Sequence, residues 1–147
     1  YMDLNDVPAS GNHWLLTDVL RNQWGYKGFV VSDAFAVGSL QVHGFAKDPE
    51  DAAYKGVSAG LNMDMASGTY VKNIGKLVSA GKIKEAQLDS MVLPILEAKY
   101  KLLELTILGI KDKEGQDVPY SREWMNALPA DDGDTLYAAV EALSKKK

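Results

Sequence analysis

Two short apolar runs that each contain an aspartate at or near their end restrict most strongly what this chain can fold into. "FVVSD" ends at Asp33, and "LNMDM" contains Asp64. The run "FVVS" does not alternate apolar with polar residues in the way a half-buried strand does, and a run of this kind is typical of a strand buried on both faces of a parallel sheet. "LNMDM" is interpreted as a second short strand. Each follows a predicted helix. The order helix, strand, helix, strand, helix indicates an α/β fold with a parallel sheet and outer helices.

The helices are predicted from apolar spacing and from residues that start and stop helices. Residues 12–23 carry apolar side chains at helical spacing after the turn and cap residues of "SGN", and the pattern stops before Gly25. Pro49 begins a second helix, which ends at Gly60. A third helix runs to about residue 80, and a longer one starts near residue 84. Pro94 is expected to kink that longer helix or to mark its start.

Length and composition exclude several classes of protein. The 147 residues are enough for one domain with a core, but a complete (β/α)8 barrel typically needs about 250 residues. A formal net charge of -4 gives no reason to expect nucleic acid or a membrane surface as partner. No apolar run approaches the roughly 18–20 residues of a membrane span, and the first ten residues do not resemble a signal peptide. Because the chain starts at Tyr1, inside what reads like the end of a strand, we expect a piece of a longer chain.

Asp33 is the strongest candidate for a functional residue in this sequence. The carboxyl ends of parallel strands are where α/β folds gather their functional side chains. A carboxylate at such an end can serve as a nucleophile, a general base or a metal ligand, and the alternative is a cap for the following helix. Position alone leaves these readings open for Asp33, and Asp64 poses the same question inside "NMDM".

The other candidate residues have simpler structural interpretations. His13 and His43 are the only histidines and lie 30 positions apart, so they do not predict a zinc site. "DDGD" at residues 131–134 does not have the ligand spacing of a calcium loop, and we interpret it as a turn that caps a final helix. There is no cysteine. We therefore expect no metal. Four aromatic residues are interpreted as core rather than as a platform for sugars: Trp14, Trp24, Tyr26 and Phe29.

The stretch "VLRNQWGYKGFVVSDAF" resembles the active-site signature of family 3 glycoside hydrolases, the β-glucosidase and β-xylosidase group. The aliphatic pair and basic residue of the signature fall on Val19-Leu20-Arg21, its glycine on Gly28, and its Ser-Asp on Ser32-Asp33. Neighbouring segments are similar to the family as well, so that the resemblance covers residues 1–102. It implies a partial (β/α)8 barrel, from the end of strand six to helix eight.

The remaining residues, 103–147, have no match in that family. They are expected to form an extra α-helical tail with a short apolar run, a linker and a terminal helix. The family's "GLFE" continuation after the closing helix is replaced by "LLELTILGIKDKEGQ". The chain is therefore divided into a partial barrel and an unmatched tail.

The resemblance also implies a function, the retaining hydrolysis of O-glycosyl bonds in a β-glucoside or related oligosaccharide, without a cofactor. Asp33 matches the family nucleophile, and Tyr1 matches a tyrosine that in many members lies beside it and binds substrate. Many members have an aromatic residue directly after the Ser-Asp, where this chain has Ala34 and then Phe35. No residue here matches the acid/base, so we expect activity in the parent enzyme and little or none from this chain alone.

Two functions of other classes stay open. The first is a non-catalytic fragment that associates with itself or with the missing part of the barrel, because an open barrel leaves strand edges and apolar helix faces uncovered. The second is a receiver-like domain in which Asp33 accepts phosphate, although Asp3 and Asp6 lie in the opening turn and not at an earlier strand end. Family members are often periplasmic or secreted, but this sequence carries no signal peptide and leaves the compartment open.

Overall fold

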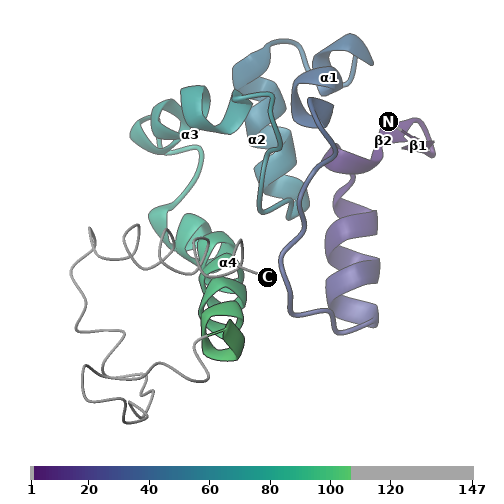
Figure 1. Ribbon diagram of the computed structural model, residues 1–147. Coiled ribbons are helices and arrows are strands. Elements are labelled where there is room, and N and C mark those ends of the chain that lie inside the picture. The colour runs from purple at the N-terminus through teal and green to yellow at the C-terminus, as the bar shows by residue number, and fades with distance from the viewer. Residues whose placement is uncertain (1, 107–147) are drawn as a thin grey trace, which may run out of the picture. The chain divides into compact units, whose positions relative to one another are not determined.

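The structure, a computed structural model, describes residues 2–106 and the side chains up to residue 102. This part of the chain is mostly helical (Figure 1). Residues up to Ala98 form one compact unit. The elements in chain order are β1 (Asp3–Leu4), β2 (Val7–Pro8), the 3-10 helix η1 (Ala9–Gly11), the π-helix η2 (Trp14–Gln23), α1 (Ala36–Val42), α2 (Pro49–Ala59), α3 (Thr69–Ser79) and α4 (Glu85–Thr106).

A small hairpin opens the described part of the chain. β1 and β2 pair antiparallel, with Leu4 opposite Val7. Asn5 and Asp6 between them have φ values of 53° and 60°, and two successive positive φ values are what the tightest hairpin turns require. The sequence suggested the end of a parallel strand here, whereas the described residues form this hairpin.

The helix predicted over residues 12–23 is confirmed, with a hydrogen-bond pattern that the spacing did not predict. It is a π-helix, and the N–H of Trp24 donates to the carbonyl of Val19, five residues earlier, at 3.0 Å. Asn12 Oδ1 accepts the N–H of Leu15 at 3.0 Å, whereas the N-cap position is occupied by His13, whose side chain makes no capping hydrogen bond. Apolar spacing predicts a helix but does not decide which carbonyl each N–H reaches.

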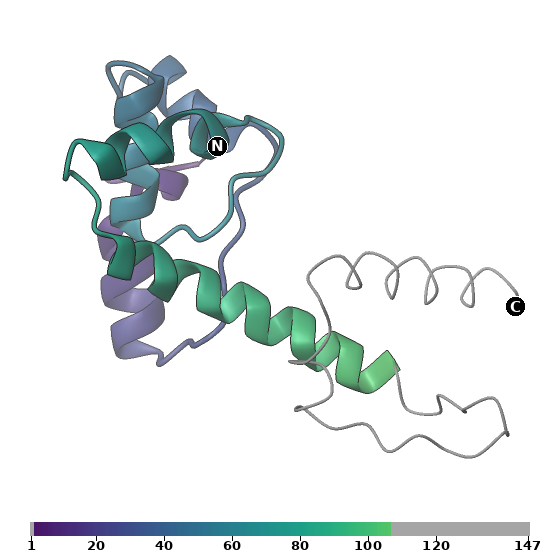
Figure 2. The same cartoon turned by 90° about the vertical axis from the view of Figure 1, so that its left-hand side faces the viewer.

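Helix α2 contacts four of the other helical elements, α1, α3, η1 and η2 (Figures 1 and 2). Its ends are those that the sequence predicted. Asp48 caps its first turn by accepting the N–H of Asp51 at 2.7 Å, Pro49 occupies the first turn, and Gly60 ends it with φ 92°. The fully buried side chains come from α1, α2, α3 and the segments that follow α2 and α3: Val37, Leu40, Val57, Leu61, Leu77 and Ile83.

Close packing of α3 on α2 depends on a glycine. A Cβ at Gly56 would lie 2.6 Å from the hydroxyl oxygen of Tyr70. That hydroxyl donates to the carbonyl of Leu61 at 2.9 Å, and the side chain is buried. Burial, and to a smaller extent the charge of Asp64, raises the pKa of Tyr70, so its hydroxyl stays a neutral donor. Only a residue without a side chain fits between the two helices at this position.

The two predicted parallel strands are present as extended segments that share one bridge. Val31 pairs in parallel with Met63. The N–H of Met63 donates to Val30 O at 3.1 Å, and the N–H of Ser32 donates to Met63 O at 2.9 Å. Figure 2 shows the two segments side by side. The alternation of helix and extended segment is therefore confirmed. Neither of these two segments forms a full strand, because among residues 2–106 each has a parallel partner on one edge alone.

The predictions for the remaining helices have different outcomes. The third helix, α3, is confirmed, and Gly81 follows it with φ 69°. Pro94 lies inside α4, which begins at Glu85, so it does not mark the start of that helix. Helix α1 was not predicted, because "AVGSLQV" is short and contains a glycine. The final helix and the linker before it lie outside the described residues.

A hydrogen-bonded arginine joins η2 to the beginnings of both extended segments. Arg21 Nη1 donates to Gly28 O at 3.1 Å, and Nη2 donates to Gly60 O at 3.0 Å. Nη2 also donates to Asn62 Oδ1 at 2.6 Å. Because the guanidinium is planar and carries several donors, it can hold carbonyl groups from two segments at once.

Asn62 continues this network into the first extended segment and α4. Its Oδ1 also accepts the N–H of Val30 at 2.8 Å, and its Nδ2 donates to Met91 O at 2.8 Å. The side chain thus replaces a backbone partner for Val30 and joins the extended pair to α4 at Met91. Residues 21 and 62 together determine how η2, the extended pair and α4 are placed.

Replacing Asn62 with alanine tests this network. Asn62→Ala removes three hydrogen bonds that are partly buried, and each contributes about 1 kcal/mol. We expect the free energy of unfolding, measured by urea denaturation of the 147-residue chain, to fall by about 3 kcal/mol. Gln41→Ala is the control, since Gln41 makes one exposed hydrogen bond of 3.4 Å, to Lys47 O. Equal losses for both variants would show that the network does not hold the fold.

Candidate active site

The carboxyl ends of the two extended segments lie together and carry Asp33 and Asp64. Beyond the bridge, the N–H of Phe35 donates to Met65 O at 2.8 Å. The N–H of Met65 in turn donates to Ser32 Oγ at 2.9 Å. The structure therefore brings the two strand-end segments to the same end of the parallel pair, as the sequence predicted.

The Asp33 carboxylate is exposed and does not cap α1. Its Oδ1 accepts the N–H of the adjacent Ala34 at 2.7 Å. The backbone carbonyl of Asp33, not its side chain, accepts the N–H of Ala36 at the start of α1, at 3.1 Å. Of the two readings that the sequence left open, the helix cap is the one that this geometry does not support.

Ser32 fixes the backbone of Asp33 from the buried side. Its side chain is 4% exposed. Its hydroxyl donates to Asp33 O at 2.8 Å and accepts the N–H of Met65 at 2.9 Å. One hydroxyl thus ties the two segments together at the backbone of Asp33.

Asp64 has the structural role that was considered for Asp33. Its Oδ2 accepts the N–H groups of Thr69 at 2.8 Å and Tyr70 at 3.2 Å, in the first turn of α3. The hydroxyl of Ser67 donates to the same carboxylate at 2.6 Å. These bonds satisfy N–H groups that a helix start otherwise leaves without partners. The two strand-end acids therefore differ in what their carboxylates contact.

The aromatic residues are more exposed than the sequence suggested. Trp14, Trp24 and Tyr26 are 52%, 74% and 42% exposed, so their interpretation as core is wrong. Phe29 is half-buried. Phe35, which follows Asp33 by two residues, is 58% exposed. Of these residues only Trp14 lies within η2, and among residues 2–102 neighbouring segments bury none of these rings completely.

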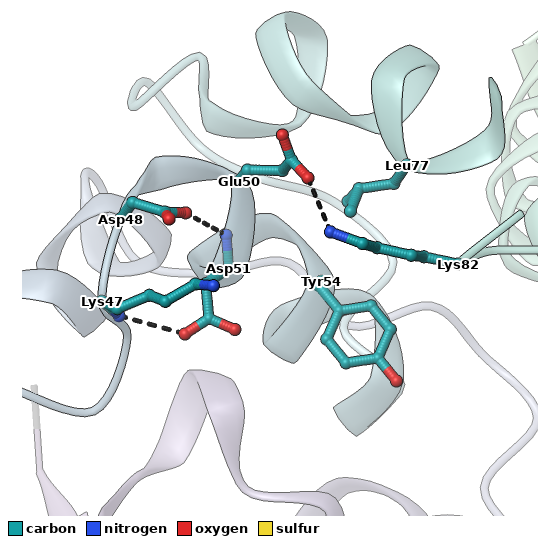
Figure 3. A pocket seen from close by; sticks show the side chains of 7 residues that line it. All are labelled: Lys47, Asp48, Glu50, Asp51, Tyr54, Leu77 and Lys82. Carbon is teal, nitrogen blue, oxygen red and sulfur yellow. Dashed lines mark hydrogen bonds and ion pairs between the residues drawn. The ribbon is translucent and has the colours of Figure 1, made fainter. Parts of the chain in front are cut away.

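A hollow of about 400 Å³ lies away from Asp33 (Figure 3). Its charged groups neutralise one another: Lys82 Nζ donates to Glu50 Oε1 at 2.9 Å, which raises the pKa of Lys82. Burial opposes ionisation of Asp51, but hydrogen bonds from Lys47 N–H and Lys55 outweigh it and lower the pKa of that carboxyl. Asp33 does not line this hollow. Its lining residues are Lys47, Asp48, Glu50, Asp51, Tyr54, Leu77 and Lys82.

The histidines lie apart, each beside an aspartate. His13 Nδ1 is 3.6 Å from Asp18 Oδ2, and His43 Nδ1 is 3.3 Å from Asp3 Oδ1. Within the described part of the chain, no three potential metal ligands gather at one place. No helix among residues 2–106 is long and apolar enough to cross a membrane. Tyr1 and the acidic turn at residues 131–134 lie outside the described residues.

Comparison with known families identifies the chain. Residues 1–98 match the family model of the glycosyl hydrolase family 3 N terminal domain. The chain belongs to glycosyl hydrolase family 3. The resemblance seen in the signature from Val19 to Phe35 is therefore confirmed, and the match ends close to where the sequence resemblance ends.

Named relatives agree with the family. The periplasmic beta-glucosidase of Salmonella typhimurium is 44% identical over 99 residues, which are 67% of this chain and 13% of the relative. A putative beta-xylosidase of Formosa agariphila is 33% identical over 126 residues, 85% of this chain and 16% of the relative. The chain thus spans a small part of the length of these family 3 relatives.

Solved family 3 structures share the fold of this part. The beta-glucosidase from Listeria innocua, crystallised in complex with glucose, matches with a TM-score of 0.68 and 35% identity. The match covers 70% of this chain and 14% of that chain. A complex of the same enzyme with gluconolactone matches equally well. The sequence prediction of a glycoside hydrolase relationship is confirmed at the level of the family.

Sequence reasoning missed the polar residues that hold this site in place. Arg21 entered only as the basic position of the signature, and Asn62 was not singled out. A signal for Asn62 was available, because an asparagine inside a short apolar run is expected to find hydrogen-bond partners when its neighbours are buried. The partners themselves lie 32 and 29 residues away in the sequence, at Val30 and Met91.

Alanine variants of the two aspartates should separate their roles by stability. Asp64→Ala removes the cap of α3 and should lower the free energy of unfolding by about 1–2 kcal/mol. Asp33→Ala removes one exposed bond to its neighbour and should change that free energy by less than about 0.5 kcal/mol. Thermal or urea unfolding of both variants measures the difference. A loss at Asp33 as large as that at Asp64 would assign Asp33 a structural role.

Proposed function

We propose that this chain is part of a family 3 enzyme that hydrolyses β-glucosides with retention of configuration, with Asp33 as the nucleophile. The observation that carries the proposal is the exposed Asp33 carboxylate at the carboxyl end of the parallel pair, in a chain whose first 98 residues match the family. We also propose that residues 1–102 are the part of a (β/α)8 barrel from the end of strand six to helix eight, and that 103–147 form a separate tail.

The proposed reaction has two displacements. The Asp33 carboxylate attacks the anomeric carbon while the bond from that carbon to the leaving oxygen breaks, and a glycosyl ester forms. A second carboxyl group, about 5–5.5 Å away in retaining enzymes, protonates the leaving oxygen. The same group then removes a proton from water, which attacks the anomeric carbon and releases Asp33.

This role requires a carboxylate that is accessible and held in one place. Asp33 is exposed, whereas the Ser32 side chain beneath it is buried. The hydrogen bonds of Ser32 to Asp33 O and Met65 N–H restrain the backbone that carries the carboxylate. Placement of a reacting group before substrate binds supplies part of the rate acceleration.

A segment exchange tests the function. Residues 1–98 would replace the matching segment of the Salmonella typhimurium periplasmic beta-glucosidase, which is 44% identical over 99 residues. The exchanged enzyme should hydrolyse p-nitrophenyl β-D-glucoside and release the β-anomer of glucose first, as followed by NMR. With Asp33→Asn in the exchanged segment, turnover should fall on the order of 10³-fold or more. An equally active Asp33→Asn enzyme, or a folded but inactive exchange, would overturn the proposal.

The 147-residue chain alone is expected to turn over little or no glucoside, because no residue in it matches the acid/base. Incubation with a 2-fluoro-glucoside followed by intact-mass measurement checks this. Rapid labelling of Asp33 in the isolated chain would show that it carries a working site by itself.

Association is a second candidate function, favoured by exposed apolar groups. Val31 and Met63, on the bridge, are 38% and 37% exposed. Val92, Leu93 and Leu96 along α4 are 47%, 55% and 43% exposed. Such groups favour pairing with another copy or with the rest of a barrel. Light scattering should show species larger than a monomer at micromolar concentration, and a monomer at all concentrations would contradict self-association.

A further inference from the structure

A second hollow, of about 320 Å³, lies where the two extended segments begin, at the opposite end of the pair from Asp33. Its lining comes from η2, α2, α4 and the start of the second extended segment. Of the described residues that line it, Arg21 alone is charged, and none is a carboxylate. Most of the others carry a hydroxyl or an amide: Thr17, Ser58, Asn62, Gln87 and Ser90. We call this site the Arg21 hollow. Its volume is at the lower end of the roughly 300–1,000 Å³ of small-molecule sites.

The charge of Arg21 has no opposite charge beside it in the part of the chain that the structure describes. None of the ion pairs among residues 2–102 includes Arg21. Its guanidinium donates instead to neutral acceptors, the carbonyls of Gly28 and Gly60 and the amide oxygen of Asn62. The side chain is half-buried. A cation with neutral partners keeps a positive potential around it, and a concave surface concentrates that potential.

Several hydrogen-bond donors around the hollow are not used by the fold. A guanidinium carries five N–H groups, and three of those of Arg21 are used, one on Nη1 and two on Nη2. The N–H on Nε and the second N–H on Nη1 therefore have no partner among residues 2–102. The Ser58 hydroxyl and the Gln87 side-chain amide also make no hydrogen bond to another described residue, and both residues are half-buried.

Gly60 leaves room beside the guanidinium. A Cβ at this position would lie 2.8 Å from Thr17 Oγ1 and 3.5 Å from Arg21 Nε. The Thr17 hydroxyl is held in place, because it donates to Ala59 O at 2.9 Å. The Nε side of the guanidinium is therefore not covered by a side chain at position 60.

We propose that the Arg21 hollow binds a small oxyanion that carries a phosphate group. Guanidinium N–H groups match pairs of phosphate oxygens, and the unused donors of Ser58 and Gln87 come from two other elements, which suits a group with several acceptor oxygens. Gln87 lies in the first turn of α4, where the helix dipole also favours negative charge. This site is separate from the one at Asp33, and the proposal does not depend on glycoside hydrolysis.

Phosphate binding to the full 147-residue chain tests the proposal. A ³¹P NMR titration with inorganic phosphate, at fixed pH and ionic strength, should show saturable binding. Gln87→Glu places a carboxylate in the lining with little change in size, and it should weaken that binding by about tenfold or more, because like charges then face each other. Ser58→Ala removes one donor without adding charge and should weaken binding about threefold or more. Circular dichroism checks that each variant is folded.

Gln41→Glu is the matched control. It adds the same charge at an exposed position on α1, outside the hollow, and should bind phosphate as the unmodified chain does. The two glutamate variants therefore separate an effect inside the hollow from the general charge of the protein.

Two further ligands identify what the hollow recognises. Acetate has two acceptor oxygens and a single charge, so it should bind about tenfold more weakly than phosphate at the same ionic strength. Glucose 6-phosphate separates two sources of the phosphate group: competition with inorganic phosphate means that a sugar phosphate can supply it, and lack of competition assigns the site to inorganic phosphate. No saturable phosphate binding by the folded chain, equal affinity for acetate, or equal weakening by Gln87→Glu and Gln41→Glu would overturn the inference.

Discussion

The hydrogen bonds that the side chains of Arg21 and Asn62 make, with each other and with the backbone, are the constraint on which the rest of this structure depends. They connect the end of η2 to the starts of both extended segments, and Asn62 reaches on to α4 through Met91 O. With those starts held, the parallel bridge forms at Val31 and Met63. The carboxyl ends of the segments are then placed together, and Asp33 lies at that end.

The two strand-end aspartates illustrate how local surroundings assign a role. Both follow an extended segment and both precede a helix. Asp64 has a serine three residues later and a helix start five residues later, so its carboxylate is occupied by N–H and hydroxyl donors. The loop after Asp33 is shorter, and α1 starts at Ala36 with the backbone carbonyl of Asp33 as the acceptor. The shorter loop leaves the Asp33 carboxylate facing solvent.

Much of the helical structure could be predicted from local signals, and the strands could not. Asp48, Pro49 and Gly60 act within one helix, so their effect on α2 is visible in the sequence. The extent of a strand depends on partners that are distant along the chain, and the described residues supply a partner on one edge alone. The apolar runs therefore predicted extended backbone correctly. The prediction of full strands was too long, because the two segments share a single bridge. Asp33 was predicted as the candidate site, whereas its support by Ser32 and Met65 N–H was not.

The sequence by itself determined the family, the positions of the main helices and the candidate nucleophile, because the signature, the helix caps and the apolar spacing are all local patterns. Tertiary structure decided that Asp64 caps a helix while Asp33 faces solvent, and that Arg21 and Asn62 hold the segments together. It also decided that the backbone of Phe35 is left-handed while its ring stays exposed. These properties depend on hydrogen bonds and packing between residues far apart along the chain, and local patterns contain no record of such partners.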